Sequence, residues 1–231
     1  MTPAVPVPAS PLAALSTKVG DMMDHTPESA YAHLRDTRPS WFLTPPGEGG
    51  IGIVRWPMTE GQVVYRDRWW MLLQDPVLLP DGRPGRYLRM VSPQLAPAVA
   101  VLPMLGDQVV LIEHFRHATR AWHWEIPRGG GTEGLGGEKN AAKEVEEELG
   151  VPARELISLG TLHPDTGILA SEVELYAARI DAVGELADGE GIRRARTVDF
   201  AEAEQMAESG RVSDSFTIAA LFRARRAGLA A

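Results

Sequence analysis

Four glutamates stand within five residues of this chain, at Glu144, Glu146, Glu147 and Glu148. On a helix, which turns by about 100° per residue, Glu144, Glu147 and Glu148 lie at positions i, i+3 and i+4. Their carboxylates therefore share one face, whereas Glu146 points away from it. The adjoining face is apolar and carries Ala141, Val145 and Leu149.

Local helix energetics disfavour this acidic face. Like charges at these spacings cost roughly 0.2–0.5 kcal/mol per pair, and the C-terminal end of a helix favours cations. Gly150 and Pro152 set that end, because glycine takes the left-handed cap and proline cannot continue the helix. Hard divalent cations such as Mg2+ are often coordinated by carboxylates and by substrate phosphates at the same time. A glutamate run taken alone is more often a solvated helix face, and a metal site is the alternative that the surrounding sequence has to support.

The neighbouring segments could position such a site. The loop 129–137 contains six glycines in nine residues, and the helix is expected at Asn140–Leu149. Two short apolar segments read as strands, Val109–Ile112 and Trp124–Pro127. This order of strand, glycine loop and acidic helix is the setting that the metal hypothesis needs.

The segment 129–151 resembles the Nudix box. Seven positions match its pattern without insertion or deletion: Gly129, Glu144, Val145, Glu147, Glu148, Gly150 and Val151. Two positions differ, since Leu135 replaces the first glutamate of the box and Lys143 replaces its arginine. In the family those two side chains brace the loop against the helix, so their joint loss indicates a replaced brace. The carboxylates that carry the metals in the family are intact.

The resemblance implies a fold class of α+β, namely a Nudix α/β/α sandwich with a mixed central sheet, preceded by a small N-terminal β-rich subdomain. It also implies Mg2+ or Mn2+ as cofactor and attack of water on a diphosphate. Glu144 and Glu148 are then the principal metal ligands, Glu147 is a ligand or a catalytic carboxylate that positions water, and the Arg128 carbonyl is a backbone ligand. Glu146 is left out because it points to another face.

Other residues are candidates for the general base and for substrate binding. In similar enzymes the base often comes from a loop late in the domain, and within Asp181–Gly191 we choose Glu190, with Glu185 second. Substrate phosphates are assigned to Arg116, Arg128, Gly129 and Gly130. We expect Glu125 to pair with Arg116 beneath the site or to lie further out. The aromatic residues Phe115, Trp122 and Trp124 favour core positions over stacking on a base.

Several further segments resemble the ADP-ribose pyrophosphatase and nucleoside-diphosphate-sugar hydrolase branch of the superfamily. They are Leu111–Arg116, Trp124–Gly129 and Asp214–Ala220. The branch implies a small-molecule nucleoside diphosphate derivative as substrate and a homodimer as the assembly. Thr166 stands where a proline marks ADP-ribose hydrolases, so nucleotide sugars and other linked diphosphates remain alternatives to ADP-ribose.

The chain has 231 residues, which we divide into four parts. These are a disordered lead-in at 1–12, a partly helical extension at 13–57, a β subdomain at 58–97 and the catalytic domain at 98–231. Within the extension, Thr26 and Pro27 predict the start of a short helix. Strands are expected at Tyr65–Trp70, around Val77 and at Tyr87–Val91, with a Pro-Asp-Gly turn before the last.

Composition excludes some function classes. The formal net charge of −8 argues against a nucleic-acid partner. The chain shows no span long enough for a membrane, no signal peptide and no cysteine, so a cytoplasmic location is expected. Two classes of function stay open: a metal-dependent diphosphate hydrolase, and a Nudix-fold protein that binds or senses a nucleotide sugar with little turnover. Isomerase chemistry on a diphosphate-bearing substrate would need catalytic groups that the sequence does not offer.

Overall fold

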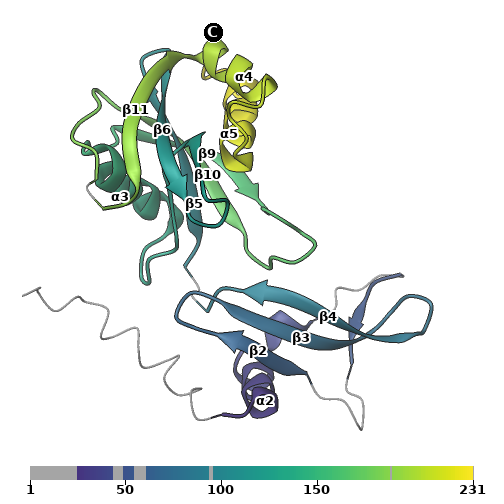
Figure 1. Cartoon of the computed structure of the whole chain (residues 1–231). Helices are drawn as coiled ribbons and strands as arrows, with labels where there is room; N and C mark the ends of the chain where they lie inside the picture. The colour runs from purple at the N-terminus through teal and green to yellow at the C-terminus, as the bar shows by residue number, and fades with distance from the viewer. Residues whose placement is uncertain (1–24, 44–48, 55–60, 94–95, 188, 231) are drawn as a thin grey trace, which may run out of the picture. The chain divides into compact units, whose positions relative to one another are not determined.

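The computed structural model describes residues 25–43, 49–54, 61–93, 96–187 and 189–230. The chain forms two compact units, of which the first comprises Met1–Pro93 with Gly167–Ala170 and the second comprises Gln94–Thr166 with Ser171–Ala231 (Figure 1). The lead-in predicted for residues 1–12 lies outside the described residues. Of the predicted extension 13–57, only 25–43 and 49–54 lie within them.

The first unit is a four-stranded antiparallel sheet with a helix on one face. Its sheet order is β1-β3-β2, and β4 pairs with β3. The elements are α2 (Pro27–Thr37), the short 3-10 helix η2 (Pro39–Phe42), β1 (Gly52–Ile53), β2 (Gln62–Arg66), β3 (Met71–Leu78) and β4 (Pro84–Val91). Tyr31 of α2 donates a hydrogen bond to the buried Asp75 of β3 at 2.5 Å, and Arg89 of β4 binds the same carboxylate. The helix of the extension and the β subdomain therefore form one unit.

Local signals predict most of this unit. The expected helix is present, with the Thr26 side chain accepting from the Ser29 backbone and proline in the first turn. The hairpin after β3 is present as well, with Gly82 at φ 82°. The strand expected at Tyr65–Trp70 is wrong in its second half, because β2 ends at Arg66. Asp67 accepts from two following backbone N–H groups, which closes a turn instead.

The second unit is a mixed sheet with helices on both faces, which confirms the expected α+β sandwich (Figure 1). Its sheet order is β11-β6-β5-β10-β9, with β7 on β6 and β8 on β5; β5 and β10 are parallel. The strands are β5 (Ala98–Leu105), β6 (Gln108–Arg116), β7 (Ala121–Glu125), β8 (Arg128–Gly129), β9 (Glu155–Leu162), β10 (Val173–Arg179) and β11 (Ile192–Asp199). The helices are α3 (Gly137–Leu149), α4 (Phe200–Glu208) and α5 (Ser215–Arg226). None of the helices among the described residues is long and apolar enough to cross a lipid bilayer.

The alternation of side chains along β6 separates two cores. Leu111 packs with the apolar residues of α4 and α5, whereas Ile112 packs with those of α3. Successive residues of a strand point to opposite faces. His114 and Arg116 therefore continue the face that α3 covers, and Glu113 continues the other.

The boundaries of the central elements differ from those expected. Helix α3 begins at Gly137 and not at Asn140, because the N-cap is Gly136, which offers no side chain as a signal. Its end is as expected, with Gly150 in the left-handed conformation at φ 66°. The strand expected at Trp124–Pro127 is also misplaced, since β7 occupies Ala121–Glu125 and β8 follows separately.

Candidate active site

The glutamates of α3 differ in burial. Glu144 and Glu148 keep only 8% and 5% of their surface exposed. The Glu147 side chain is 54% exposed, and Glu146 is exposed as well. The helix thus directs two carboxylates toward the sheet and leaves two in solvent.

Glu148 carries an unsatisfied oxygen. Its Oε2 is buried and has no hydrogen-bond partner among the described residues. Burial, reinforced by the charge of Glu144, raises the pKa of Glu148 to about 8, although Arg116 and the backbone N–H of Arg128 favour its ionised form. A buried carboxylate oxygen without a partner is rare in proteins. It is the kind of group that a bound cation would satisfy.

Glu144 lies against the glycine loop. Burial raises its pKa, and the charges of Glu147 and Glu190 act in the same direction, while Lys143 opposes them. A Cβ atom placed on Gly129 would come within 2.2 Å of both Glu144 oxygens. Glycine at this position therefore leaves the space that the carboxylate occupies.

Gly129→Ala tests this packing. The added methyl group would displace the Glu144 carboxylate, whose side chain can turn away without unfolding the helix. We expect the hydrolysis that the box-like segment implies to fall by about 100-fold, the effect of displacing a reacting geometry by about 1 Å, with little change in thermal stability. Steady-state kinetics and a melting curve measure the two quantities. Normal activity in this variant would mean that the Glu144 position is not critical.

The backbone of Arg128 faces α3. Strand β8 pairs with β5, and Val101 donates its N–H to Pro127 O at 2.9 Å. Because backbone groups alternate in direction along an antiparallel strand, those of Arg128 point away from β5. Its N–H reaches Glu148, and its carbonyl points the same way. This orientation is the one that a backbone metal ligand at this position requires.

Glu147 does not join the two buried carboxylates. Lys143 pairs with it at i+4, and its Nζ also lies 3.4 Å from Glu144 Oε1. Among the described residues, no group of three or more His, Cys, Asp or Glu side chains is arranged to hold a metal ion. An exposed i,i+4 pair is worth only about 0.3–0.5 kcal/mol, so a cation can readily compete with Lys143 for Glu147. The hard oxygens of Glu144 and Glu148, with Glu148 Oε2 lacking a partner among the residues that the structure describes, fit a divalent cation.

The glycine loop has a brace that replaces the missing glutamate and arginine. Asn140 is fully buried, accepts a hydrogen bond from Thr132 at 3.0 Å and donates one to Gly130 O at 3.0 Å. It ties the loop to the first turn of α3. The Lys143 side chain contacts Glu144 and Glu147, and the Leu135 side chain has no polar atom that could form a hydrogen bond.

A buried carboxylate holds both candidate arginines. Glu125 accepts from Arg116 Nε at 3.1 Å and lies 3.5 Å from Arg128 Nη2, which confirms the expected pairing with Arg116. His114 Nδ1 lies 3.3 Å from the same carboxylate. Burial alone would raise the pKa of Glu125, but His114, Arg116 and Arg128 outweigh it and lower the pKa. Both arginines are thus partly buried and oriented at the edge of the acidic cluster.

Asp214 is a site neighbour that sequence reasoning did not assign to the site. It caps α5 by accepting from the Thr217 backbone, and its other oxygen lies 3.2 Å from Arg128 Nη1. Thr217 Oγ1 in turn accepts from Ile126 N at 3.0 Å. The signal was an Asp-x-x-Thr pattern at a helix start, which predicts a cap but not the contact with Arg128.

The loop before β11 ends near the site. The charge of Glu190 acts on Glu144, so these two acidic groups are close enough to interact. Glu185 instead lies at the end of α3, where its carbonyl would come within 2.4 Å of a Cβ on Gly150. Asp188 lies outside the described residues. Of the two acids considered for the base, Glu190 is the one whose charge reaches the buried carboxylates.

The aromatic residues are not all in the core. Trp124 packs partly against the apolar core under α4 and α5, as expected. Trp122 is exposed, so the expected core position is wrong for it. The Arg193 guanidinium covers its ring at 4.2 Å from the centroid.

Comparisons with known proteins agree with this architecture. The NUDIX domain family matches residues 94–217, more than half of the chain. A CMP-5'-(N-acetyl-N-hydroxy-3-aminopropyl)phosphonate hydrolase of Streptomyces rubellomurinus (strain ATCC 31215) is 27% identical over 165 residues, covering 71% of this chain and 79% of that protein. A crystal structure of an ADP compounds hydrolase superposes with a TM-score of 0.64 at 20% identity, covering 80% of this chain and 96% of the other. That last likeness concerns the fold.

Proposed function

The chain belongs to the Nudix family and is a Nudix pyrophosphohydrolase, and we propose that it cleaves the diphosphate bond of a nucleoside diphosphate derivative with the help of Mg2+ or Mn2+. The observation that carries the metal dependence is Glu148 Oε2, a buried oxygen beside Glu144 that has no hydrogen-bond partner among the residues described. Two adjacent buried carboxylates without a cation would be a costly arrangement to maintain.

The residues that would hold the metal are Glu144, Glu148 and the Arg128 carbonyl, with Glu147 joining them after release from Lys143. When bound, divalent cations neutralise phosphate oxygens and lower the pKa of water. The protein's own contribution is orientation and charge. Glu125 holds Arg116 and Arg128 in place for the phosphates. Gly129 makes room for Glu144, and the backbone of Gly129 and Gly130 is the proposed phosphate contact.

Glu190 is the proposed general base, supported by its electrostatic effect on Glu144. Its exposed position allows it to take a proton from water and to release it to solvent. Glu190→Gln should lower kcat by about 100-fold, the low end for loss of a general base, with little effect on KM or metal binding. Glu185→Gln, on the same loop, is the control. A larger loss of kcat in Glu185→Gln would indicate that Glu185, and not Glu190, is the general base.

The substrate class rests on the family and on one relative. The name of that relative describes a hydrolase that acts on a CMP-phosphonate. The candidate substrates of this chain therefore include nucleotides joined to a phosphonate, beside ADP-ribose and nucleotide sugars. The test is nucleotide release from ADP-ribose, UDP- and GDP-sugars, dinucleotides and a CMP-phosphonate, with Mg2+ and with Mn2+. Release of a nucleoside monophosphate from one class supports the proposal. If no compound of the panel is hydrolysed with either metal, the proposed function is contradicted.

A catalytically weak binding or sensor protein is the second candidate. The departures at Leu135, Lys143 and Thr166 favour it. Calorimetric titration of the same compounds separates the two functions: tight binding without turnover supports the sensor, and turnover supports the enzyme.

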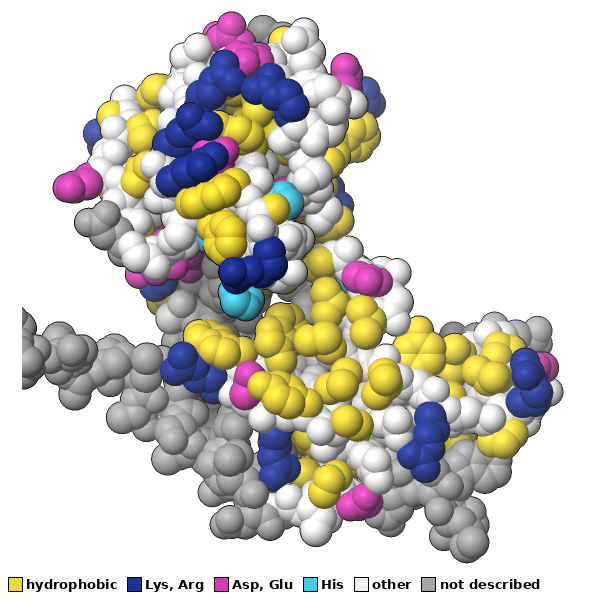
Figure 2. Space-filling view, in the orientation of Figure 1, with side chains coloured by type: hydrophobic (Ala, Val, Ile, Leu, Met, Phe, Trp, Pro, Cys, Tyr) yellow, Lys and Arg dark blue, Asp and Glu magenta, His cyan; other side chains and the backbone are white. Residues whose placement is uncertain are grey.

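We further propose a homodimer. Large apolar side chains stay exposed on the first unit, and Figure 2 shows them as yellow groups over its sheet. Among the exposed apolar residues of this unit, Tyr65 and Leu88 pair with Leu72 and Gln74 and so lie on the sheet face away from α2, whereas Tyr87 pairs with Asp75 on the other face. Apolar groups on an open sheet face are candidates for association. A monomer mass in light scattering at micromolar concentration would contradict the proposal.

A further inference from the structure

Glu113 is a buried carboxylate that the proposed reaction does not use. It lies on β6, keeps only 6% of its surface exposed, and points to the face opposite α3. Arg193 binds it in bidentate fashion, with Nε at 2.8 Å and Nη2 at 2.6 Å, and Arg194 adds a third hydrogen bond. The hydrogen bonds from Arg193, followed by the one from Arg194, overcome the effect of burial and hold the pKa of Glu113 at about 2. The carboxylate is therefore ionised across the working pH range.

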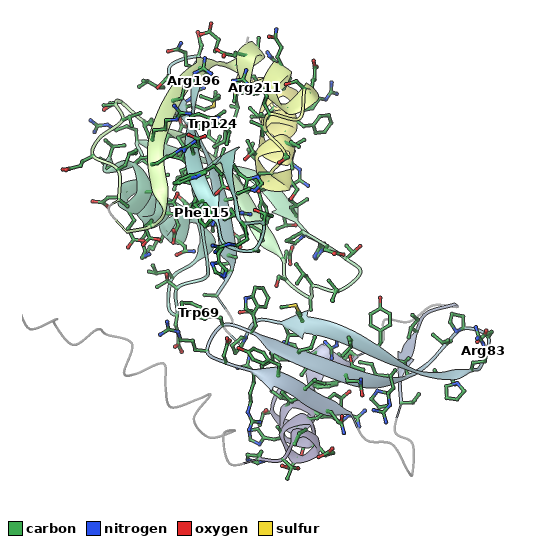
Figure 3. The ribbon with its side chains drawn as sticks, in the orientation of Figure 1. Trp69, Arg83, Phe115, Trp124, Arg196 and Arg211 are labelled. Atoms are coloured by element: carbon green, nitrogen blue, oxygen red, sulfur yellow. The ribbon has the colours of Figure 1, made fainter. Side chains whose placement is uncertain are left out.

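A bulge in β11 makes this double contact possible. Ile192 pairs with His114 and Arg194 pairs with Glu113, so Arg193 is an extra residue in the register. In a regular strand, consecutive side chains point to opposite faces, and only the bulge lets both arginines meet one carboxylate. Two tryptophans flank the contact, with Arg193 over Trp122 at 4.2 Å and Arg194 over Trp124 at 5.2 Å. In Figure 2, dark blue Lys and Arg side chains lie beside yellow apolar side chains on the second unit. Figure 3 labels Trp124 and Phe115 on the sheet of the same unit.

The same strand end carries the proposed base. Gly191 accepts a hydrogen bond from Phe115 N at 2.9 Å, and Glu190 immediately precedes it. Glu190 is three residues from Arg193. A Cβ atom on Gly191 would lie 3.7 Å from the His114 ring, so the residue that follows Glu190 lies against the α3 face of β6. A shift at the bulge would therefore be passed to Glu190 over a very short length of backbone.

At this end β11 pairs with β6 through Ile192 and Arg194, on either side of the bulge. It is the edge strand of the sheet, and β6 is its neighbour in the sheet order. A bulge removes part of the ladder where it occurs. The charge-assisted hydrogen bonds to Glu113 replace that loss, because bidentate arginine–carboxylate contacts fix geometry as well as adding energy.

We propose that Glu113 is a positioning residue, which clamps Arg193 and Arg194 on one face of the sheet so that Glu190 is held at the acidic cluster on the other. This inference rests on the proposed function, in which Glu190 is the general base. Glu113 itself does not touch the substrate. Its removal should affect proton transfer and leave the metal ligands and the substrate arginines in place.

Glu113→Gln tests the proposal, because it keeps the shape of the side chain and removes the charge that holds two arginines. We expect kcat to fall about tenfold, less than the roughly 100-fold effect of a full 1 Å displacement, with KM and the Mg2+ dissociation constant unchanged. In the Glu190→Gln background, the same change should cause no further loss beyond about twofold, because coupled residues are not additive. Hydrogen exchange of the amides in 189–194 should become faster while that of α3 is unchanged.

Glu204→Gln is the matched control. Glu204 holds Arg225 by a similar bidentate contact, at 2.9 and 2.6 Å, between α4 and α5. Its loss should leave kcat and the exchange of 189–194 as in the parent.

Three results would overturn the inference alone: an unchanged kcat in Glu113→Gln, losses that multiply in the double variant, or an equal fall of kcat in Glu204→Gln. A parent that hydrolyses no compound of the panel refutes the proposed function instead, and the exchange measurement, which needs no activity, still reports whether Glu113 holds residues 189–194.

Discussion

Glu148→Gln should reduce hydrolysis by at least about 1000-fold while the protein stays folded. Glutamine has nearly the same shape but lacks the second anionic oxygen. Glu148 Oε2 is a buried atom that has no hydrogen-bond partner within the described part of the chain. Loss of several kcal/mol of metal-based stabilisation, at about 1.4 kcal/mol per factor of ten, corresponds to this reduction. Nucleotide release at saturating substrate, followed over several hours with the variant at about ten times the parent's enzyme concentration, measures it.

Glu146→Gln is the matched control for that result. Glu146 has the same side chain, lies two residues away on the same helix and is exposed on a different face. Its replacement should leave the rate within about twofold of the parent, as expected for a surface substitution. Equal losses in the two variants would show that the helix, and not Glu148, is what the substitutions disturb.

In the absence of metal, the protein should become less stable as the pH rises from about 5 to 8. The pKa of Glu148 is raised from 4.5 to about 8 in the folded state, first by burial and then by Glu144. The folded protein therefore binds a proton in this range that the unfolded chain releases, and stability falls with rising pH. The penalty is absent below the unfolded pKa and complete above the folded one.

The expected size is a few kcal/mol. A shift of this magnitude corresponds to roughly 5 kcal/mol at most, and relaxation of the buried site reduces it to on the order of 2–4 kcal/mol. At about 2–4 °C per kcal/mol for a chain of this size, the melting temperature in EDTA should fall by several degrees between pH 5.5 and pH 8. Glu144, whose pKa is also raised, adds to the slope.

Two comparisons make the stability prediction specific. Glu148→Gln should flatten the slope and melt higher than the parent at pH 8 in EDTA, because the buried charge is gone. Mg2+ should restore the parent by about 2.7 kcal/mol at 100 times its dissociation constant, and should act little on the variant. A parent that is equally stable at both pH values, or a variant that Mg2+ stabilises equally, would contradict the metal assignment.

These two predictions have one physical origin. The group that should be most needed for hydrolysis is also the group that destabilises the metal-free fold, as is common where a site is built for a ligand. A glutamate kept at such a cost is better explained by binding than by packing.

Much of the fold follows from local patterns. The cap at Thr26, the turn around Gly82 and the left-handed Gly150 are set by residues within a few positions, so the sequence predicts them. The start of α3 was missed because Gly136 offers no capping side chain. The end of β2 was missed because Asp67 forms a turn in a segment of strand-forming residues.

For the candidate site, the helical period alone predicts that Glu144 and Glu148 share a face and that Glu146 leaves it, because this depends only on the geometry of one helix. The resemblance to the Nudix box adds the family and the kind of chemistry. The contact of Glu125 with Arg116 is one of the two alternatives that the sequence leaves open, and the structure decides for it because the two residues lie on neighbouring strands of one hairpin.

Only the tertiary structure decides the contacts that join distant segments. Helical spacing places Glu147 and Glu148 on the same face, but Glu148 is buried and Glu147 is exposed. The difference arises because the sheet covers one side of α3 and solvent covers the other. Asp214 meets Arg128, and Glu113 meets Arg193 and Arg194, across long stretches of chain. The second contact depends on a one-residue bulge in the register of two strands, and no local pattern encodes a register, because it is set by the packing of the whole sheet.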